Sequence, residues 1–274
     1  CTSPQRFKVM DIKIGKKIVH ASTGGRQPQK REEAIILIHG AGMNRTAWQL
    51  QTRNLSHRGF QAYALDLPGH GRSDGPSLKN IEEMANWVNR VLEVMKIDQA
   101  TIIGHSMGAL VALDFGSRFE NITKSLILIG VADSMRVHED LLAAAKDKPS
   151  LASNMITLWG IGEKAHKGGH LQPGYWLAGA NHRLLELSAP NTLFTDLSAC
   201  NNYNDGLKAA KNINCPVKLI LGDNDRMTPK KRGVVLGKFI KNVSIDIIPD
   251  CGHMIMVEQP EAVFQSLKQF FLLE

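Results

Sequence analysis

A serine stands where an apolar strand pattern changes directly into a helical pattern. The stretch "ATIIGHSMGALVAL" covers residues 100–113, with Gly104 and Gly108 two positions away from Ser106 on either side. This G-x-S-x-G spacing is typical of a tight strand-to-helix turn that presents the serine hydroxyl above the carboxyl end of a sheet. The first N–H groups of the helix suit a developing negative charge. We predict that Ser106 is a nucleophile; the alternative is a serine that only caps a tight turn.

A serine hydroxyl stays protonated at neutral pH and needs an adjacent base. Of the ten histidines, His253 in "IIPDCGHMIMVEQPE" follows the last expected strand and precedes the last expected helix. It is therefore expected at the same sheet edge as Ser106, in the role of general base. We expect the other histidines to pack in loops or to lie at the surface, and His105 to point away from Ser106 across the turn.

The base needs a carboxylate that holds its tautomer and stabilises the imidazolium. The stretch "LILGDNDRMTP" offers Asp223 and Asp225 at the end of an expected strand, and Asp133 follows another strand. We favour Asp225 because it lies further into a short loop, which Pro229 ends by starting a helix. Asp133, where the chain leaves the sheet, and Asp223 remain alternatives.

Attack on a carbonyl also needs N–H donors for the oxygen that becomes negative. The residues "HGAG" (39–42) follow directly on the apolar run "AIILI". We predict that the backbone amides of Ala41 and Met107 are these donors, and that Gly40 and Gly42 let the loop approach closely.

The elements that must position these residues alternate along the chain. Strands are expected over 34–40, 61–69, 100–106, 124–131, 217–223 and 243–250, after an N-terminal antiparallel hairpin split by Gly15. Helices are expected over 79–96, from Ser106 to Phe119, from Pro229 and from Pro260 to Phe271. Strands that alternate with crossover helices predict an α/β fold with a doubly wound, mostly parallel sheet.

Residues 133–210 break this alternation. They show helical fragments such as "HEDLLAAAKD" and "HRLLELS", but no convincing strand. Since so long a segment exceeds a plain crossover, we predict an inserted helical cap over one end of the sheet. The core then consists of residues 1–132 and 211–274. Trp159, Tyr175 and Trp176 are candidates to close over a substrate.

The composition is ordinary for a globular protein of 274 residues, with 43% hydrophobic and 22% charged residues. The formal net charge of +7 arises mainly in residues 1–31, where eight Lys and Arg face one acid, Asp11. A solvated basic hairpin explains this excess, and no recognition motif accompanies it, so no nucleic-acid partner is expected. The longest apolar runs are too short for a membrane span.

The four cysteines, Cys1, Cys200, Cys215 and Cys251, follow no CxxC or metal-ligand spacing. They are expected to be free thiols in a reducing, cytoplasmic compartment, with lipid anchoring through Cys1 as the alternative. No cluster of histidines and carboxylates has ligand spacing, so neither a metal nor another cofactor is expected. A homodimer is left open.

Together the blocks "LIHGAGMNRTAW", "ALDLPGHGRSDGP", "IIGHSMGALVAL", "LILGDNDRMTPKK" and "CGHMIMVEQPEAV" resemble α/β-hydrolase-fold enzymes with a helical cap, over nearly the whole chain. The resemblance is to the broad group of small bacterial carboxylesterases and carbon–carbon bond hydrolases. It implies Ser106, Asp225 and His253 as nucleophile, acid and base, and the amides of Ala41 and Met107 as the oxyanion hole. The dehalogenase and epoxide-hydrolase branches have aspartate in place of this serine.

Four apolar side chains beside these blocks are expected to line a soft substrate pocket: Met43, Trp48, Met227 and Met254. Ordinary core packing is the alternative for them, and no Arg or Lys is predicted to face the site. The sequence thus predicts a carboxylesterase that acts on small-molecule, mainly apolar esters through an acyl-enzyme on Ser106. A carbon–carbon hydrolase, lactonase, thioesterase or perhydrolase with the same triad, and a non-catalytic receptor, are the alternatives.

Overall fold

A sheet of eight strands organises the computed structural model, which describes residues 10–29, 31–168 and 174–272. Across the sheet the strands lie in the order β1-β2-β4-β3-β5-β6-β7-β8. Their bounds are Met10–Ile14 (β1), Lys17–Ser22 (β2), Ala34–Ile38 (β3), Gln61–Leu65 (β4), Ala100–His105 (β5), Thr123–Ile129 (β6), Val217–Gly222 (β7) and Val243–Ile248 (β8). β2 pairs antiparallel with β1 and β4, and the other neighbouring pairs are parallel. The predicted doubly wound, mostly parallel sheet is confirmed.

The central strands are buried on both faces. Every residue of β3, β5 and β7 is buried, as parallel strands covered by helices on both sides require. Because side chains alternate along a strand, Ile36 and Ile38 of β3 join one apolar cluster while Ile35 and Leu37 join the other. The sheet therefore separates two apolar cores.

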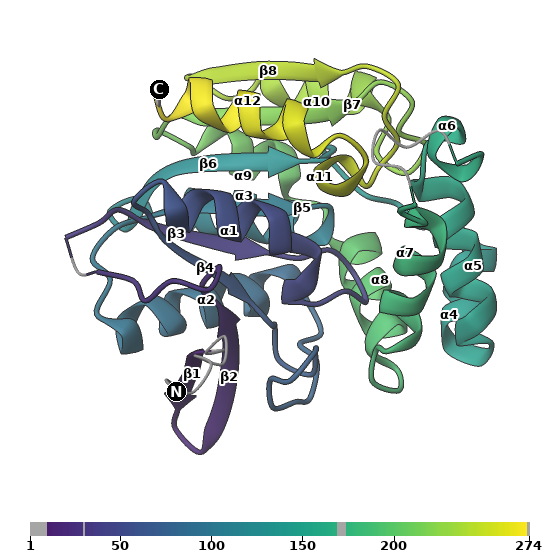
Figure 1. The fold of residues 1–274 in the computed structure, drawn as a ribbon, viewed down its shortest axis with the longest axis horizontal. Helices are drawn as coiled ribbons and strands as arrows, with labels where there is room; N and C mark the ends of the chain where they lie inside the picture. Colours follow the sequence, from purple (N-terminus) through teal and green to yellow (C-terminus); the bar gives the residue numbers. More distant parts are fainter. Residues whose placement is uncertain (1–9, 30, 169–173, 273–274) are drawn as a thin grey trace.

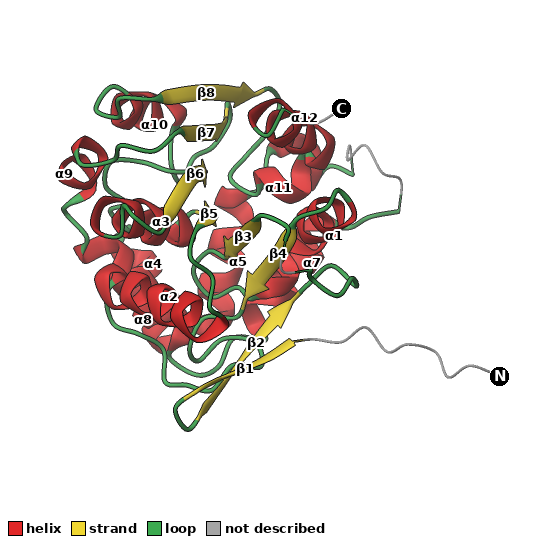
Figure 2. Ribbon diagram, turned by 90° about the vertical axis from the view of Figure 1, so that its left-hand side faces the viewer, coloured by secondary structure: helices red, strands yellow, loops and turns green. Residues whose placement is uncertain are grey.

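Helices cover both faces of the sheet (Figure 2). One face carries α1 (Gln49–His57), α11 (Ile255–Glu258) and α12 (Pro260–Phe270). The other face carries α2 (Ile81–Met95), α3 (Met107–Arg118), α9 (Gly206–Lys211) and α10 (Lys230–Gly237). Of these, α2, α3, α10 and α12 match helices expected from the sequence.

Helix α1 was missed because its inward face is partly polar. It follows a short 3₁₀ turn, Arg45–Trp48, and buries Gln51, Thr52 and Ser56 beside Leu55. The Gln51 side chain donates to the carbonyl of Met256 at 2.8 Å, and the Thr52 hydroxyl donates to the carbonyl of Trp48. Polar residues satisfied in this way remove the apolar periodicity on which a sequence-based helix prediction depends.

The segment between β6 and β7 places five helices at the carboxyl ends of the parallel strands (Figure 1). They are α4 (Glu139–Asp147), α5 (Pro149–Gly160), α6 (Glu163–His166), α7 (Leu177–Glu186) and α8 (Thr192–Asn202). The described part of this insertion contains no strand. The next helix, α9, packs against α3 and so belongs to the layer that covers the sheet. The division into a core and a cap at residues 133 and 210 stays a prediction.

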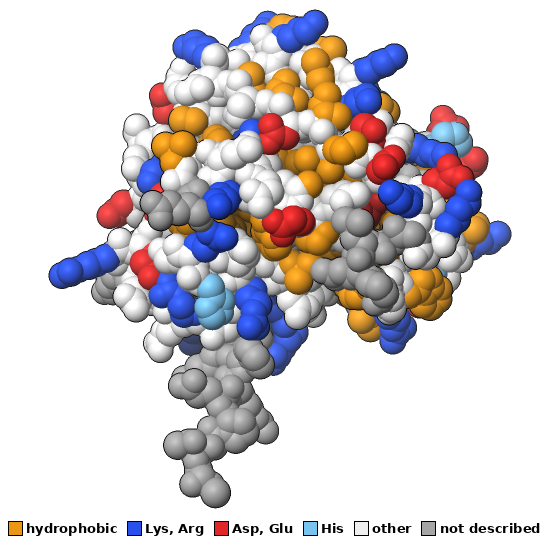
Figure 3. Space-filling model, turned by 45° about the horizontal axis from the view of Figure 1, so that its top comes forward, with side chains coloured by type: hydrophobic (Ala, Val, Ile, Leu, Met, Phe, Trp, Pro, Cys, Tyr) orange, Lys and Arg blue, Asp and Glu red, His pale blue; other side chains and the backbone are white. Residues whose placement is uncertain are grey.

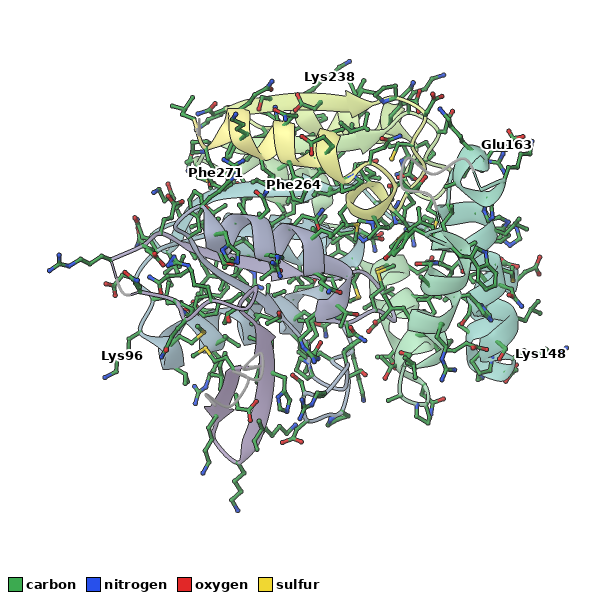
Figure 4. The ribbon with its side chains drawn as sticks, viewed as in Figure 1. Lys96, Lys148, Glu163, Lys238, Phe264 and Phe271 are labelled. Carbon is green, nitrogen blue, oxygen red and sulfur yellow. The ribbon has the colours of Figure 1, made fainter. Side chains whose placement is uncertain are left out.

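Positive charge is distributed over the molecule. Lys96, Lys148 and Lys238 project from widely separated parts of the surface (Figure 4). On the face seen in Figure 3, Asp and Glu side chains lie between those of Lys and Arg. Among the described residues, no helix combines the length and the apolar character that crossing a membrane would need. Residues 1–9 and 30, which include Cys1 and part of the basic segment 1–31, lie outside the described part of the chain.

Candidate active site

The turn that carries Ser106 is strained and tightly packed. Ser106 has φ 53° and ψ −117°, a backbone conformation that residues other than glycine rarely adopt. Its N–H donates to the carbonyl of Ile129 at 2.9 Å, which ties the turn to the neighbouring strand β6. A Cβ atom at Gly104 would overlap the backbone of Gly108, and one at Gly108 would overlap the carbonyl of Ile38. The turn therefore leaves no room for a side chain at either position, in keeping with the G-x-S-x-G spacing of the sequence.

His253 and Asp225 form a buried pair. Nδ1 of His253 lies 2.8 Å from Oδ2 of Asp225. Because a carboxylate oxygen only accepts, Nδ1 carries a proton, so in the neutral ring Nε2 is the unprotonated nitrogen. Nε2 is buried and has no hydrogen-bond partner among the described residues. The pair therefore has the tautomer that a general base needs.

Several donors hold the Asp225 carboxylate in place. Oδ1 accepts the N–H groups of Met227 and Thr228, each at 2.8 Å, and Oδ2 accepts the Thr228 hydroxyl at 2.7 Å. Burial alone would raise the pKa of Asp225, but the attraction of His253 and the hydrogen bonds from His253 and Thr228 outweigh it and lower that pKa. The carboxylate therefore stays ionised beside the histidine at neutral pH.

The two alternative acids lie elsewhere. Asp133 accepts a hydrogen bond from Nε of Arg232 at 2.9 Å, and Asp223 accepts the N–H of Cys251 at 3.2 Å. Helix α10 begins at Lys230, one residue after Pro229, so the loop that holds Asp225 is as short as the sequence predicts. The geometry supports Asp225 as the partner of His253.

Ser106 and His253 line one cavity of about 440 Å³ between the strand ends and the inserted helices. The surface that lines this cavity is mostly apolar. Ala41 lines it directly behind β3, whereas the Met107 side chain is buried in the core on the α2 face of the sheet. The Met107 amide opens α3 and has no acceptor within its helix, as for any first helical residue. Gly40, next to Ala41, packs against the nucleophile turn, because a Cβ atom there would come within 3.4 Å of Ser106 Cβ.

Three of the four predicted pocket side chains line the cavity: Met43, Met227 and Met254. The expectation for Trp48 is wrong. Its side chain is fully buried beneath the site in the apolar cluster, with its ring edge-on to His105 at 6.5 Å between centroids. The 3₁₀ turn before α1 rotates Trp48 inward, which its position in the sequence does not reveal.

The inserted helices supply lining residues that the sequence did not identify. Trp159 lines the cavity, but Tyr175 and Trp176 are exposed and lie outside it. The residues missed in the inserted segment are Met135, Arg136, Val137, His138, Leu141, Ile156, Gly160, Leu197 and Cys200. Arg226 and Thr228, in the loop after β7, were missed as well. Two of these residues, Arg136 and Arg226, are cations that nothing in the sequence placed at the site. Leu141 and Ile156 lie on apolar helix faces, a signal that is equally typical of core packing.

His105 and Glu258 support the loop that carries His253. Nε2 of His105 donates to the carbonyl of His253 at 2.9 Å, and burial lowers the pKa of His105 to about 3, so this ring is neutral. Glu258 accepts the N–H groups of Gly252 and Met254, each at 3.0 Å, on either side of His253. The rings of His105 and His253 also pack together, with centroids 4.8 Å apart, so His105 contributes to the site through His253.

No group of three or more His, Cys, Asp or Glu side chains suited to a metal ion occurs in the part of the chain that the structure describes. The donors near Ser106 are instead engaged with one another, as in the Asp225–His253 pair. Ser106 therefore shares its cavity with a histidine that is paired with a buried carboxylate.

The sequence model of the alpha/beta hydrolase family matches residues 35–266. This range includes the turn with Ser106 and the loops with Asp225 and His253. The chain belongs to the alpha/beta hydrolase family. The resemblance read from the sequence, and the fold it implied, are confirmed.

The individual relatives match either only part of the chain or nearly the whole chain at low identity. An uncharacterised protein of Mycobacterium tuberculosis is 41% identical over 97 residues, which cover 35% of this chain and 28% of that protein. The (E)-2-((N-methylformamido)methylene)succinate hydrolase of Acinetobacter baylyi is 23% identical over 253 residues, 88% of this chain and 90% of that protein. The solved structure of a thermophilic esterase has a TM-score of 0.79 at 26% identity and covers 96% of each chain.

Proposed function

We propose that the protein is a serine hydrolase that cleaves carboxylic esters through an acyl-enzyme on Ser106. The observation that carries the proposal is the buried Asp225–His253 pair, whose unprotonated Nε2 shares one cavity with Ser106. Hydrogen bonds between nucleophile and base are often long before a substrate binds, so the absence of a short one does not weigh against the role.

In the proposed first step, Nε2 of His253 takes the proton as Ser106 Oγ attacks the ester carbonyl. The carbonyl oxygen becomes negative and is stabilised by the N–H groups of Ala41 and Met107. When the carbon–oxygen bond of the ester breaks, His253 returns the proton to the leaving alcohol. A water molecule, deprotonated by the same nitrogen, then releases the carboxylic acid and restores Ser106.

The cavity supports small, mainly apolar substrates. Three methionines, Met43, Met227 and Met254, together with Ile156 and Leu197, offer a deformable apolar lining. A volume of about 440 Å³ lies within the usual range for small-molecule sites of roughly 300–1,000 Å³. The 26% identity with a thermophilic esterase supports an ester as the bond that is cleaved.

An activity-based label combined with an ester panel tests the proposal. A fluorophosphonate should modify the protein once, at Ser106, as mapped by peptide mass spectrometry. Hydrolysis rates should be compared for p-nitrophenyl esters of two to sixteen carbons, an aryl thioester, a lactone and a vinylogous 1,5-diketone. Esters of short or medium chains should have the highest kcat/KM. Labelling without ester turnover, but with cleavage of the diketone, would transfer the assignment to a carbon–carbon hydrolase.

We expect the activity to be independent of metal ions. The proposed triad supplies nucleophile and base without a Lewis acid. Dialysis against a chelator should leave kcat/KM for a p-nitrophenyl ester unchanged, measured beside an untreated sample carried through the same dialysis. Loss of turnover that a single divalent ion restores would contradict the mechanism.

A further inference from the structure

A carboxylate from the inserted helices reaches the loop that carries Ala41. Asp196 lies on α8, and its side chain is fully buried. Its Oδ2 accepts the N–H of Gly42 at 2.8 Å and lies 2.7 Å from Nε2 of His70. The contact between Asp196 and Gly42 joins residues 154 positions apart in the sequence. The proposed mechanism assigns no role to Asp196 or His70.

The hydrogen-bond partners of His70 identify its protonation state. Nδ1 lies 3.0 Å from the carbonyl oxygen of Pro68, and Nε2 faces Asp196. A carbonyl oxygen and a carboxylate both only accept, so both ring nitrogens carry protons. His70 and Asp196 therefore form a buried ion pair of imidazolium and carboxylate.

The loop is held on both sides of Ala41. The carbonyl of Gly40 accepts Nδ1–H of His39 at 2.9 Å and the N–H of Met43 at 3.2 Å. His39 is the neutral tautomer, since its Nε2 accepts the N–H of Leu67 at 3.2 Å. These bonds orient the peptide between Gly40 and Ala41. The bond from Gly42 to Asp196 orients the next peptide, so the direction of the Ala41 N–H is fixed from two sides.

Helix α8 also packs closely on this loop. Gly42 has φ +67°, and a Cβ atom there would come within 2.7 Å of Leu193 on α8. Leu197 on the same helix lines the cavity. The position of α8 and the conformation of the loop are therefore linked by packing as well as by the Asp196 hydrogen bond.

We infer that Asp196, paired with His70, is a positioning residue that holds the Ala41 N–H toward the oxyanion formed during catalysis. The inference rests on the proposed function. A carboxylate suits the task because a charged acceptor makes a stronger hydrogen bond to an N–H than a neutral one. His70 offsets the cost of burying that charge. Because Asp196 lies on α8, the geometry of the oxyanion site then depends on the position of this helix.

The ion pair also predicts an alkaline limit. Burial alone would lower the pKa of His70, but Asp196 and the hydrogen bonds to Asp196 and Pro68 outweigh it and raise the pKa, with a contribution from Asp66. The other groups that face the pair are the His39 ring, 4.7 Å from that of His70, and Cys200 on α8; Asp66 is itself paired with Arg45. Because the pKa of His70 in the folded protein lies above its ordinary value of about 6.5, the ion pair is fully formed below about pH 6.5. It is lost as the pH rises through the higher pKa that His70 has in the folded protein.

Substitutions at Asp196 test the inference through kcat. Asp196→Ala leaves the Gly42 N–H without its acceptor, and we expect kcat for a p-nitrophenyl ester to fall on the order of 10- to 100-fold. KM should stay within about threefold, because the oxyanion forms only in the transition state. Asp196→Asn keeps an acceptor and should restore part of the lost kcat. Removing an oxyanion donor outright costs about 10²–10³, which bounds the effect.

Asp114→Asn is the matched control. Asp114 is also a buried carboxylate; it accepts the hydroxyl of Tyr203, which follows α8, and pairs with Arg118. It has no contact with the Ala41 loop among its hydrogen bonds in the described part of the chain. This variant should retain the kcat of the parent, measured at the same temperature.

A trifluoromethyl ketone distinguishes misplacement of the Ala41 N–H from a general loss of structure in the cavity. It adds to the serine and forms a tetrahedral oxyanion, whereas the carboxylic acid product binds without forming one. In Asp196→Ala the inhibition constant of the ketone should rise by the factor by which kcat falls, and that of the product should not change. In the parent, kcat and ketone affinity should fall together above neutral pH, and His70→Gln should move or abolish this alkaline decline.

Each outcome decides between the proposals. An active parent labelled at Ser106, with unchanged kcat and ketone affinity in Asp196→Ala, overturns the inference alone. Equal losses in Asp114→Asn, or a rise in KM without a fall in kcat, overturn it as well. If Asp196→Ala does not fold, Asp196→Asn decides, and an unchanged kcat with an unchanged inhibition constant of the ketone in that variant rejects the inference. A parent that neither hydrolyses the ester nor reacts at Ser106 overturns the proposed function, and the inference falls with it.

Discussion

Ser106→Ala is expected to lower kcat for an activated ester by about 10⁶-fold, the scale of nucleophile loss in serine hydrolases. The substitution removes the oxygen that would form the acyl-enzyme. Among the described residues, the only other hydroxyl that lines the cavity is that of Thr228, which donates to Asp225. Residual turnover should reflect only the oxyanion donors and binding. Alanine has a smaller side chain than serine, so the strained turn should tolerate it.

Ser198→Ala provides the matched control for this change. The Ser198 hydroxyl donates to the carbonyl of Phe194 within α8, and its side chain is not part of the cavity lining. Steady-state kinetics of both variants, with circular dichroism to verify folding, should show loss of turnover and of fluorophosphonate labelling in Ser106→Ala alone. A folded Ser106→Ala protein with near-normal kcat would refute the acyl-enzyme mechanism.

Asp225→Asn is expected to reduce kcat by about 10⁴-fold with the fold retained, as when the acid of a serine–histidine–aspartate triad is changed to asparagine. The N–H groups of Met227 and Thr228 would keep the amide oxygen on their side, so the amide nitrogen would face Nδ1 of His253. Nδ1 would then become the acceptor and Nε2 would carry the proton. In that tautomer His253 has no lone pair with which to accept the proton of Ser106.

Asp133→Asn tests the same idea from the other side. Asp133 pairs with Arg232, so its substitution should leave kcat within about tenfold of the parent. Both variants should be measured across pH, with thermal unfolding recorded for each. If Asp133→Asn lost most of its kcat while Asp225→Asn remained active, the acid would belong to the end of β6. Our triad would then be wrong in one member.

The predictions that succeeded depend on local rules. A tight strand-to-helix turn leaves no room for a Cβ atom at Gly104 or Gly108, so the glycines in the sequence already report the turn. Continuous apolar runs mark strands that are buried on both faces, and the positions of β3 to β8 follow from them. The parallel arrangement then brings the ends of β5, β7 and β8 to one edge.

The predictions that failed depend on the direction of individual side chains. Trp48 and Met43 both lie just beyond β3, yet Met43 lines the cavity and Trp48 is buried beneath it. Tyr175 and Trp176 are as aromatic as Trp159, but only Trp159 reaches the substrate side. Such distinctions depend on how a turn rotates or a helix is seated, and composition carries no signal for either.

The sequence by itself determined the sheet, the presence of a helical insertion and the residues proposed as nucleophile and base. These follow from periodicity, chain order and the steric demands of one turn. Only the tertiary structure decided that Asp225 rather than Asp133 faces His253, which inserted side chains line the cavity, and that Asp196 meets His70 across 126 positions of sequence. The physical reason is that local propensity sets each element, whereas contacts between distant elements depend on how their side chains pack together in three dimensions.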